Sequence, residues 1–397
     1  MKQGWEIKKL GEVVDVLDNL RKPITKRDRI EGKYPYYGAT GILSYVHNYI
    51  FSEKLVLIGE DGAKWASGDN TSFIAEGKYW VNNHAHVIRP NRKIIIDEWI
   101  VYFLNFSDLT PFITGMTVPK LNQEKMRSIP IPLPPLPEQQ RIVSILDECF
   151  AAIDKAKANA EQNLKNAKEL FESYLQGVFE NKGDGWEEKR FEDLIKENQI
   201  GLIKSTKEQS NDKPYRYLKM DSITSNNNLV HDKYVYVDAD KNELEKFTLN
   251  DGDFLLNTRN SYELVGKTCV FTPIDDEPTL FNNNIMRVVF NKGISSRFIN
   301  YAFSSELVKE RLQKLKSGTT SVVGIYYKGL RNLKIPVTNY EDQQTIVRQL
   351  DALRAETQKL EAVYQQKIDD LEELKKSILQ KAFAGELKTE TKLQIAN

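Results

Sequence analysis

The spacing of apolar residues divides the chain into four stretches of two kinds. Residues 1–137 and 183–340 hold short apolar runs broken by Gly, Asn and Pro, which predicts short strands with one or two helices. Residues 138–182 and 341–388 instead carry apolar positions at alternating steps of three and four, which is typical of a helix packed along one seam. The pattern therefore predicts two globular domains, each followed by a long helix, and a tail at 389–397.

Each helical stretch has one apolar stripe, interrupted at the matching place by an extra step of four residues, a stutter that locally unwinds a supercoil. A helix of about 40 residues is ~60 Å long, whereas a small domain spans only ~30 Å. Because covering its own domain would use only part of such a helix, we expect the two helices to pair with each other. The predicted core of the pair is Ile142, Leu146, Ile153, Leu164 and Phe171 in the first helix, and Ile346, Leu350, Leu353, Leu360, Ile368, Leu371 and Ile378 in the second.

The two halves of the chain also share words in the same order. "GWEIKKLGEV" at 4–13 returns as "GWEEKRFEDL" at 185–194, and "EQQRIV" at 138–143 returns as "DQQTIV" at 342–347. A period of about 200 residues is too long for a solenoid and indicates two whole domains of one plan. The two adjacent glutamines in each copy of the second word have no role in the helical pattern, and docking of a partner is one hypothesis for them.

Composition narrows the class of protein. With 40% hydrophobic and 28% charged residues the chain has the composition of a globular protein, and its 56 basic and 56 acidic residues give no net charge. No apolar run approaches the ~18 residues of a membrane span, and the N-terminus lacks the pattern of a signal peptide. The two cysteines, Cys149 and Cys269, are too few for a disulfide framework. We expect a cytoplasmic protein that does not interact with membranes.

The motifs of common catalytic sites are absent from the sequence. There is no phosphate-binding G-x-x-x-x-G-K-S/T loop, no H-E-x-x-H, no C-x-x-C and no Asn-Pro-Pro-aromatic motif of amino-methyltransferases. His84 and His86 stand two apart on one face of a predicted strand and could bind a metal, but the second copy has no ligands at the matching place. We therefore expect no catalytic residue, metal or cofactor in this chain, and predict a protein that binds.

Three segments in each copy have the composition of a nucleic-acid contact. A basic stretch precedes tyrosines at 19–38 and at 201–220, a Gly- or Asn-bearing loop follows an apolar strand, and a loop with small hydroxyl residues comes near the end of each domain. Lys and Arg hold DNA phosphates, while Arg and Asn also read base edges. A solvated surface, or a turn that serves only the backbone, would give the same local sequence. The candidates are Arg21, Lys22, Lys26, Arg27, Tyr36, Lys64, Trp65 and His84 in the first copy, and Lys204, Lys207, Tyr217, Lys219, Arg259, Asn260, Ser261, Tyr262, Lys316, Thr319 and Thr320 in the second.

Four segments together resemble the specificity subunit of type I restriction-modification enzymes. They are "RKPITKRDR" at 21–29, "NNHAHVIRP" at 82–90, "IPIPLPPLPEQQRIVSILD" at 129–147 and "LEELKKSILQKAFAGEL" at 371–387. The resemblance covers nearly the whole chain, and the proline strap with its helix start is its most specific part. The second copy departs from it, because "IPVTNYEDQQTIV" at 335–347 has lost three prolines of the strap.

The resemblance implies both a fold and a function. The implied fold is α+β or α/β, with two similar DNA target-recognition domains separated by two long helices that form an antiparallel coiled coil, a pseudo-two-fold internal repeat. Each domain would read one half of a split, asymmetric site in double-stranded DNA. The helix pair would set the spacing of the half-sites and dock two modification subunits, which bind S-adenosylmethionine and methylate adenine. Restriction subunits that use ATP and Mg²⁺ would complete the nuclease, and this chain would be non-catalytic.

Two other classes stay open when the residues alone are considered. The first is a coiled-coil scaffold that touches no nucleic acid, and the basic and tyrosine-bearing segments in both copies count against it. The second is a stand-alone nuclease or methyltransferase, and the missing cofactor motifs count against that. Methyl transfer by the purified chain alone would support the enzyme, and a salt-dependent shift of DNA would exclude the scaffold.

Overall fold

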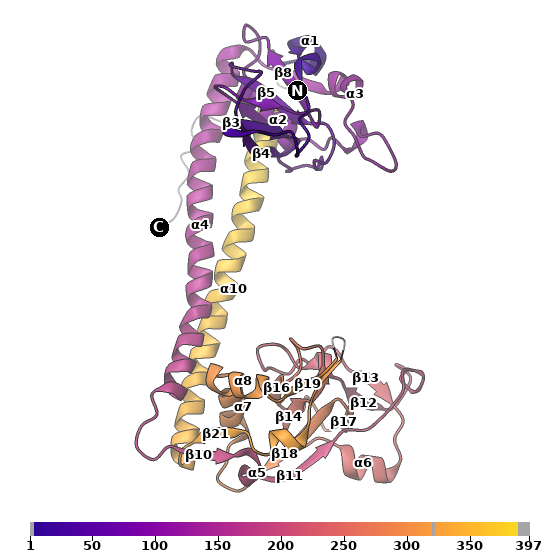
Figure 1. The fold of residues 1–397 in the computed structure, drawn as a ribbon, viewed down its shortest axis with the longest axis vertical. Helices are drawn as coiled ribbons and strands as arrows, with labels where there is room; N and C mark the ends of the chain where they lie inside the picture. The colour runs from indigo at the N-terminus through magenta and orange to yellow at the C-terminus, as the bar shows by residue number, and fades with distance from the viewer. Residues whose placement is uncertain (1–3, 320–321, 388–397) are drawn as a thin grey trace. The chain divides into compact units, whose positions relative to one another are not determined.

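The computed structural model describes residues 4–319 and 322–387, and the contacts divide the chain into two units. Unit 1 comprises Met1–Gln162 with Tyr364–Asn397, and unit 2 comprises Asn163–Val363. Two long helices, α4 (Leu136–Glu180) and α10 (Tyr340–Ala384), each belong partly to unit 1 and partly to unit 2 (Figure 1). In each unit the helix segments accompany a globular body of strands and short helices.

Unit 1 is built on a four-stranded antiparallel sheet with the order β2-β8-β5-β6. A second sheet has the order β4-β3-β7, and β1 pairs with β9. The strands are β1 (Glu6–Lys9), β2 (Val14–Val16), β3 (Glu31–Gly38), β4 (Gly41–Val46), β5 (Leu55–Gly59), β6 (Ser72–Ala75), β7 (Trp80–Val81), β8 (Ala85–Pro90) and β9 (Pro130–Leu133). The helices are α1 (Leu10–Val13), η1 (Asp18–Leu20), α2 (Asp97–Phe106), η2 (Thr110–Phe112) and α3 (Gln123–Ser128).

Unit 2 repeats this plan with the sheet order β11-β18-β14-β16, a second sheet β13-β12-β17, the pair β10-β21 and a small sheet β15-β20-β19. Its strands are β10 (Glu187–Arg190), β11 (Ile195–Ile200), β12 (Tyr215–Leu218), β13 (Val235–Val237), β14 (Phe254–Asn257), β15 (Arg259–Asn260), β16 (Thr268–Val270), β17 (Thr279–Phe281), β18 (Ile285–Phe290), β19 (Lys316–Gly318), β20 (Val323–Ile325) and β21 (Lys334–Val337). Its helices are α5 (Phe191–Leu194), η3 (Thr206–Glu208), η4 (Met220–Ser222), α6 (Lys241–Phe247), α7 (Ser296–Ser304), α8 (Glu306–Gln313) and α9 (Tyr327–Leu330).

The repeat extends to single backbone hydrogen bonds. The amide of Leu10 donates to the carbonyl of Ile129 at 2.8 Å, and in unit 2 the amide of Phe191 donates to Leu333 at 2.8 Å. At the edge of the main sheet, the bond from Glu60 to the carbonyl of His84 is matched in unit 2 by a bond from Thr258 to Asn284, at 2.9 and 2.8 Å. The predicted fold class of two similar domains of mixed helix and sheet, with long helices, is therefore confirmed.

The long helices run antiparallel within each unit. In unit 1, Lys157 of α4 pairs with Glu372 of α10 at 2.7 Å, and Asp154 pairs with Lys375 at 3.2 Å, so the numbers rise on one helix as they fall on the other. In unit 2 the hydroxyl of Tyr174 donates to Gln349. The helix segments also complete the globular cores. Ile142, Leu146, Ile153 and Ile378 belong to the core of unit 1, and Leu350, Phe171 and Ile346 pack into the core of unit 2.

One residue of the predicted helix core is placed differently. Leu360 has 41% of its surface exposed, whereas Thr357, one turn earlier, is 2% exposed. A straight helix drifts ~20° per heptad against a strict seven-residue repeat, so the residue that faces the seam changes near the extra four-residue step. The prediction for Leu360 was therefore wrong. Ile368 is buried, and Leu164, Leu353 and Leu371 are half-buried.

The difference between Leu350 and Leu360 gives a testable pair of variants. We expect Leu350→Ala to lower the free energy of unfolding by about 2–5 kcal/mol, because it opens a cavity in a fully buried core. Leu360→Ala should change it by less than about 0.5 kcal/mol, as for most surface substitutions. Urea unfolding followed by circular dichroism measures both, and equal losses in the two variants would contradict this placement.

Candidate nucleic-acid interface

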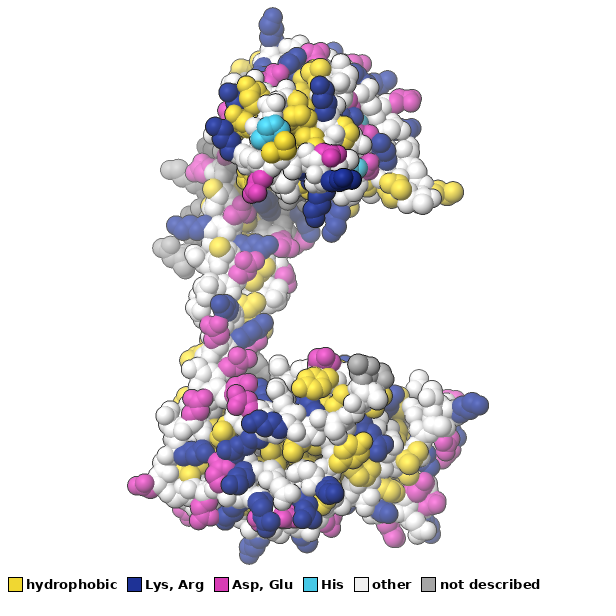
Figure 2. Space-filling model, viewed as in Figure 1, with side chains coloured by type: hydrophobic (Ala, Val, Ile, Leu, Met, Phe, Trp, Pro, Cys, Tyr) yellow, Lys and Arg dark blue, Asp and Glu magenta, His cyan; other side chains and the backbone are white. Residues whose placement is uncertain are grey.

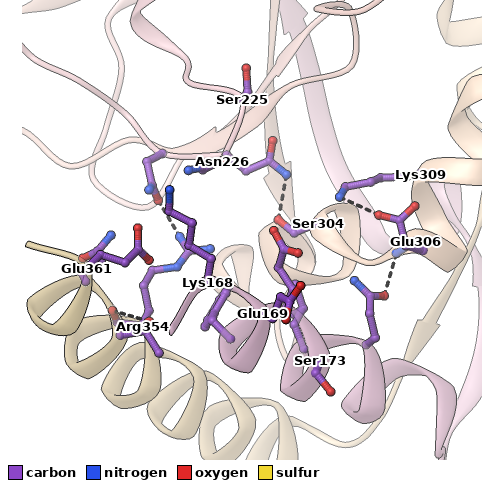
Figure 3. A pocket seen from close by; sticks show the side chains of 18 residues that line it. Lys168, Glu169, Ser173, Ser225, Asn226, Ser304, Glu306, Lys309, Arg354 and Glu361 are labelled. Atoms are coloured by element: carbon purple, nitrogen blue, oxygen red, sulfur yellow. Dashed lines mark hydrogen bonds and ion pairs between the residues drawn. The ribbon is translucent and has the colours of Figure 1, made fainter. Parts of the chain in front are cut away.

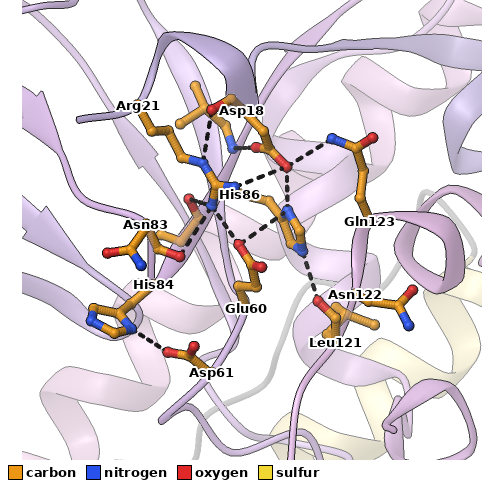
Figure 4. A network of polar contacts seen from close by, with 12 residues as sticks. Asp18, Arg21, Glu60, Asp61, Asn83, His84, His86, Leu121, Asn122 and Gln123 are labelled. Carbon is orange, nitrogen blue, oxygen red and sulfur yellow. Dashed lines mark hydrogen bonds and ion pairs between the residues drawn. The ribbon is translucent and has the colours of Figure 1, made fainter. Parts of the chain in front are cut away.

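The structure brings the three predicted segments of the first copy together at one end of β5 and β8. The segment after η1, the loop that follows β5 and the stretch before α3 all contribute to a network of polar contacts (Figure 4). The guanidinium of Arg21 donates to Glu60 at 2.5 Å and to the carbonyl of Ala85 at 2.8 Å. Lys120 reaches the same Glu60 carboxylate at 2.7 Å. These three segments are therefore held against one another by ion pairs to the Glu60 carboxylate, which is 9% exposed.

His86 lies at the centre of this network and is fully buried. Its Nδ1 lies 2.6 Å from Asp18, and its Nε2 lies 2.7 Å from the carbonyl oxygen of Leu121. Burial by itself would raise the pKa of Asp18, but the hydrogen bond and charge of His86, the amide of Val87 and the side chain of Gln123 outweigh it, so this pKa is lowered. The network therefore holds Asp18 ionised.

Glu60 is held ionised in the same way. Burial tends to raise its pKa, and the hydrogen bonds from Lys120 and Arg21 more than reverse that effect, so the pKa is lowered. Among the described residues, Asp18, Glu60 and His86 form a group whose ligand atoms all lie within 4.8 Å of one another, as a metal site requires. Here the cationic side chains of Arg21 and Lys120 already contact the Glu60 carboxylate. The group is therefore built as a protein ion-pair cluster.

The two histidines that the sequence suggested as a pair do not share a site. His84 precedes β8, is exposed and contacts Asp61, whereas His86 is buried within β8 and faces Asp18. The reason is that β8 begins at Ala85, so His84 belongs to the turn before the strand. The expectation that both lie on one face of a strand was therefore wrong.

Three other candidates of the first copy have structural roles inside the unit. The Arg21 guanidinium is bound within the network, with only 12% of the side chain exposed. Tyr36 is buried, and its hydroxyl accepts a hydrogen bond from the amide of Ile24. Trp65 is buried and donates its indole N–H to the carbonyl of Gly59. Arg21 binds groups of other segments, whereas Tyr36 and Trp65 bind backbone groups near them in the chain. In each case the partner satisfies a polar group that burial removes from water.

The candidates of the first copy that remain at the surface are Lys22, Lys26, Arg27 and Lys64, together with His84. Figure 2 shows Lys and Arg side chains mixed with Asp and Glu on the visible face of each unit. The chain as a whole carries no net charge. The exposed basic candidates are carried by particular loops.

In the second copy the candidates divide in the same way. Tyr217 is fully buried and its hydroxyl donates to the carbonyl of Leu202 at 2.5 Å. Lys204 pairs with Glu243 at 3.0 Å and is 12% exposed. Lys207 is exposed and Lys219 is half-buried. Tyr217 and Lys204 thus hold their segment in place, as Tyr36 and Arg21 do in unit 1.

The small sheet β15-β20-β19 gathers the other candidates of the second copy. Arg259 and Tyr262 are exposed, and the Lys316 amine lies 2.7 Å from the Tyr262 carbonyl and 4.7 Å from the centre of its ring. Asn260 and Ser261 are half-buried beside them, and Thr319 is exposed. Thr320 lies outside the described residues. A guanidinium, an amine and a phenol at one edge suit contacts with phosphates and base edges, and form no catalytic group.

The sequence pattern revealed no role for the glutamines of the repeated hexapeptide, "EQQRIV" and "DQQTIV". Gln139 is fully buried; its amide oxygen accepts from the Ile96 amide at 3.1 Å, and its nitrogen donates to the carbonyls of Ile94 and Pro134, each at 2.8 Å. Gln343 makes the same three bonds in unit 2, from Ser295 and to Gly293 and Thr338, at 2.8, 3.2 and 2.8 Å. Each glutamine therefore joins the first turn of a long helix to the start of α2 or α7.

Unit 2 also has a polar groove of about 720 Å³ between α4, α10, α8 and the loop at 225–228 (Figure 3). Arg354 of α10 donates to Asn228 at 2.6 Å and lies over the rings of Phe171 and Tyr301, 4.6 and 5.1 Å from their centres. Glu169, Glu306 and Glu361 alternate with Lys168 and Lys309 along its walls (Figure 3). A groove with mixed charge suits a protein segment more than a nucleic acid.

Residues 2–165 and 183–371 each match the type I restriction modification DNA specificity domain, and together they make up most of the chain. The chain belongs to this family. It is a specificity subunit of a type I restriction-modification system, whose catalysis lies in other subunits. No helix in the part of the chain that the structure describes is long and apolar enough to cross a membrane.

Several relatives are specificity subunits too. A putative type I restriction enzyme specificity subunit of Haemophilus influenzae is 41% identical over 152 residues, which are 38% of this chain and 39% of that protein. The MjaVIII specificity subunit of Methanocaldococcus jannaschii is 24% identical over 407 residues, covering 97% and 93% of the two chains. The EcoKI specificity subunit of Escherichia coli is 25% identical and covers 85% and 75%.

Solved structures share the fold of this specificity subunit. The HsdS subunit of Thermoanaerobacter tengcongensis superposes with a TM-score of 0.57 at 19% identity and covers 98% of both chains. A chain from a structure that describes complex assembly and conformational transition of the type I R-M system gives a TM-score of 0.71, also at 19% identity, with 98% and 99% covered. At this identity the likeness concerns the fold alone.

Proposed function

We propose that each globular domain reads one half of a bipartite, asymmetric target in double-stranded DNA. The recognition domains are residues 1–137 and 183–340, the spacer helices are residues 138–182 and 341–388, and residues 389–397 form a tail. The observation that carries the proposal is one backbone frame used twice with different side chains at its edge. Where unit 1 pairs Asp61 with Lys120, unit 2 pairs Arg259 with Gly324. Two domains with the same backbone but different side chains at the sheet edge suit the recognition of two different half-sites.

The exposed candidates supply the contacts in this proposal. Lys22, Lys26, Arg27 and Lys64 in unit 1, with Lys207 and Lys219 in unit 2, would hold phosphates and fix the register on the duplex. Arg259 and its neighbours Asn260, Ser261 and Tyr262 would face base edges, because a guanidinium can bond two acceptors of one guanine. Lys316 and Thr319 would contact the backbone beside them. His84 is the candidate with a smaller role, since its ring already contacts Asp61.

The helix pair would set the distance between half-sites and dock two modification subunits. Its support is the continuity of α4 and α10, each of which is one unbroken helix of 45 residues. The polar groove beside Arg354 in unit 2 is a suitable docking place for a protein segment. In this proposal S-adenosylmethionine belongs to the modification subunits, and ATP with Mg²⁺ belongs to the restriction subunits.

Shortening both long helices tests the spacing. Removing four residues from the middle of each helix shortens it by about 6 Å, which is roughly two base pairs at ~3.4 Å per pair. We expect the variant to methylate sites whose spacer is shorter by about two pairs and to lose the original sites. Methylome sequencing of host cells that carry either form measures the change.

The control for this experiment is an exchange of four exposed residues at the same level of each helix without any deletion. That variant should keep the original motif. If the shortened variant folds and still modifies the original spacing, the helices do not set the distance. If the unaltered chain, together with its modification subunits, shows no selective and salt-dependent binding of the motif, the DNA-reading proposal itself fails.

A further inference from the structure

The segment before α3 in unit 1 forms a short hairpin that extends away from the globular body (Figure 1). Thr114 and Lys120 close it through two backbone hydrogen bonds of 2.9 and 2.8 Å. Gly115 has a φ of +89°, and a Cβ at this position would lie 2.5 Å from the carbonyl oxygen of Val118. Pro119 fixes its own backbone angle and favours an extended residue before it. The conformation of the tip is therefore set before any partner binds.

The hairpin is rooted in the buried network described above. The Leu121 amide donates to the carbonyl of Glu60 at 2.8 Å, and the Leu121 carbonyl accepts from His86. Asp61 and Lys120 pair as an isolated bridge. The hairpin is thus rigidly attached to the loop after β5. It would therefore lose little conformational entropy when it binds a partner.

The tip itself is apolar and fully in water. Met116 is 104% exposed and Val118 is 63% exposed, and Figure 2 shows hydrophobic side chains at the end of this projection. Single exposed apolar residues are common on protein surfaces. Two of them on one pre-formed tip, with exposed lysines on the three segments that meet at its base, form a different kind of surface. Those lysines are Lys22, Lys64 and Lys125.

We propose that Met116 and Val118 form a wedge that enters the DNA of one half-site and partly separates a base step, while the surrounding lysines hold the adjacent phosphates. This inference rests on the proposed DNA-reading function. Proteins that bend DNA insert Met, Leu, Ile, Phe or Pro side chains between bases in this manner, and the deformation contributes to sequence selection. A polyanionic duplex that offers apolar base faces matches an apolar tip with a basic surround.

Among the described residues of unit 2, the matching turn between β19 and β20 repeats only part of this apolar tip. Gly318 stands where Gly115 does, since a Cβ there would lie 2.3 Å from the carbonyl oxygen of Val322. The residue after this glycine is Thr319, a polar side chain, where unit 1 has Met116. Val322, which matches Val118, is apolar and 57% exposed. Because the second hairpin has Thr319 in place of the long apolar side chain of Met116, we expect only unit 1 to deform a base step.

The test uses the chain in complex with its modification subunits and duplexes that contain its methylated motif, with 2-aminopurine placed at each half-site position in turn. The modification subunits flip the adenines that they methylate, so these positions are left out of the comparison. At the other positions, the unsubstituted complex should give a fluorescence rise from unstacking within one half-site only. Met116→Ala with Val118→Ala should abolish this rise and weaken binding at least tenfold. Met116→Leu with Val118→Ile should keep both, because the apolar volume remains.

Ile7→Ala is the matched control, because it removes an exposed apolar side chain from β1 of the same unit. It should bind and unstack DNA as the unsubstituted chain does. Equal DNA affinity and fluorescence in the double alanine variant would overturn the wedge, and so would normal DNA binding with loss of the modification subunits, because the tip would then dock a protein. Absence of selective binding by the unsubstituted complex would instead reject the underlying function.

Discussion

Replacing Gln139 by Leu is expected to lower the stability of unit 1 by about 3–5 kcal/mol. The substitution keeps the side-chain volume but leaves the Ile96 amide and the carbonyls of Ile94 and Pro134 without their partner in a buried place. Each buried polar group that loses its hydrogen bond costs ~1–3 kcal/mol. Four of the five tryptophans, Trp5, Trp65, Trp80 and Trp99, lie in unit 1, so their fluorescence during urea unfolding reports on this unit.

The adjacent Gln140 supplies the control, because it is exposed on the same turn. Gln140→Leu should unfold within about 0.5 kcal/mol of the unsubstituted chain. Gln343→Leu should produce the corresponding loss in unit 2, followed through Trp186. If the Gln139 and Gln140 variants unfold at the same urea concentration, the buried amide does not hold the helix to α2. Docking of a partner would then be the better explanation for the glutamines.

Replacing Arg21 by Leu is expected to cost about 3–5 kcal/mol of stability, the usual loss when one member of a buried ion pair is removed. The carboxylates of Asp18 and Glu60 would keep their negative charge beside each other with only His86 and Lys120 to balance it. Arg21→Lys should recover little, because a single ammonium cannot reproduce the planar fork that reaches Glu60 and the Ala85 carbonyl.

Lys22→Leu separates this structural role from DNA contact, because Lys22 is the exposed neighbour of Arg21. It should leave the unfolding midpoint unchanged and weaken binding of the target duplex, with a smaller dependence on salt. Arg21→Leu should mainly lower the midpoint. A stable Arg21→Leu variant that has lost only its DNA affinity would show that this guanidinium contacts DNA directly.

The sequence could specify much of the fold because the relevant signals are periodic or repeated. The steps of three and four from Ile142 to Phe171 and from Ile346 to Ile378 indicate a helix seam over many turns, so a single exception such as Leu360 does not hide it. The repeated sequence motifs indicate two domains with the same fold, since two domains with the same fold need the same turns and the same strand ends. Both signals average over tens of residues.

The candidate site could be predicted only as segments. Arg21 and Lys22 are adjacent basic residues, so local composition cannot tell that the first is bound inside the network and the second is exposed. Glu60, His86 and Lys120 are far apart in the chain, and only the pairing of β5 with β8 and the bridge between Asp61 and Lys120 bring their partners into reach. Long-range contacts of this kind decide whether a charge is desolvated and paired.

By itself, then, the sequence determined that this protein has two similar domains of mixed structure joined by long helices, and it indicated the family. Only the tertiary structure decided that Gln139 and Gln343 are buried, and that Met116 is fully exposed. It also decided which candidates bind inside their own unit, namely Arg21, Tyr36, Trp65 and Tyr217. The physical reason is that periodicity is a local property of the chain. Burial, by contrast, depends on which distant backbone groups fold over each side chain, and burial determines what a polar or apolar group can do.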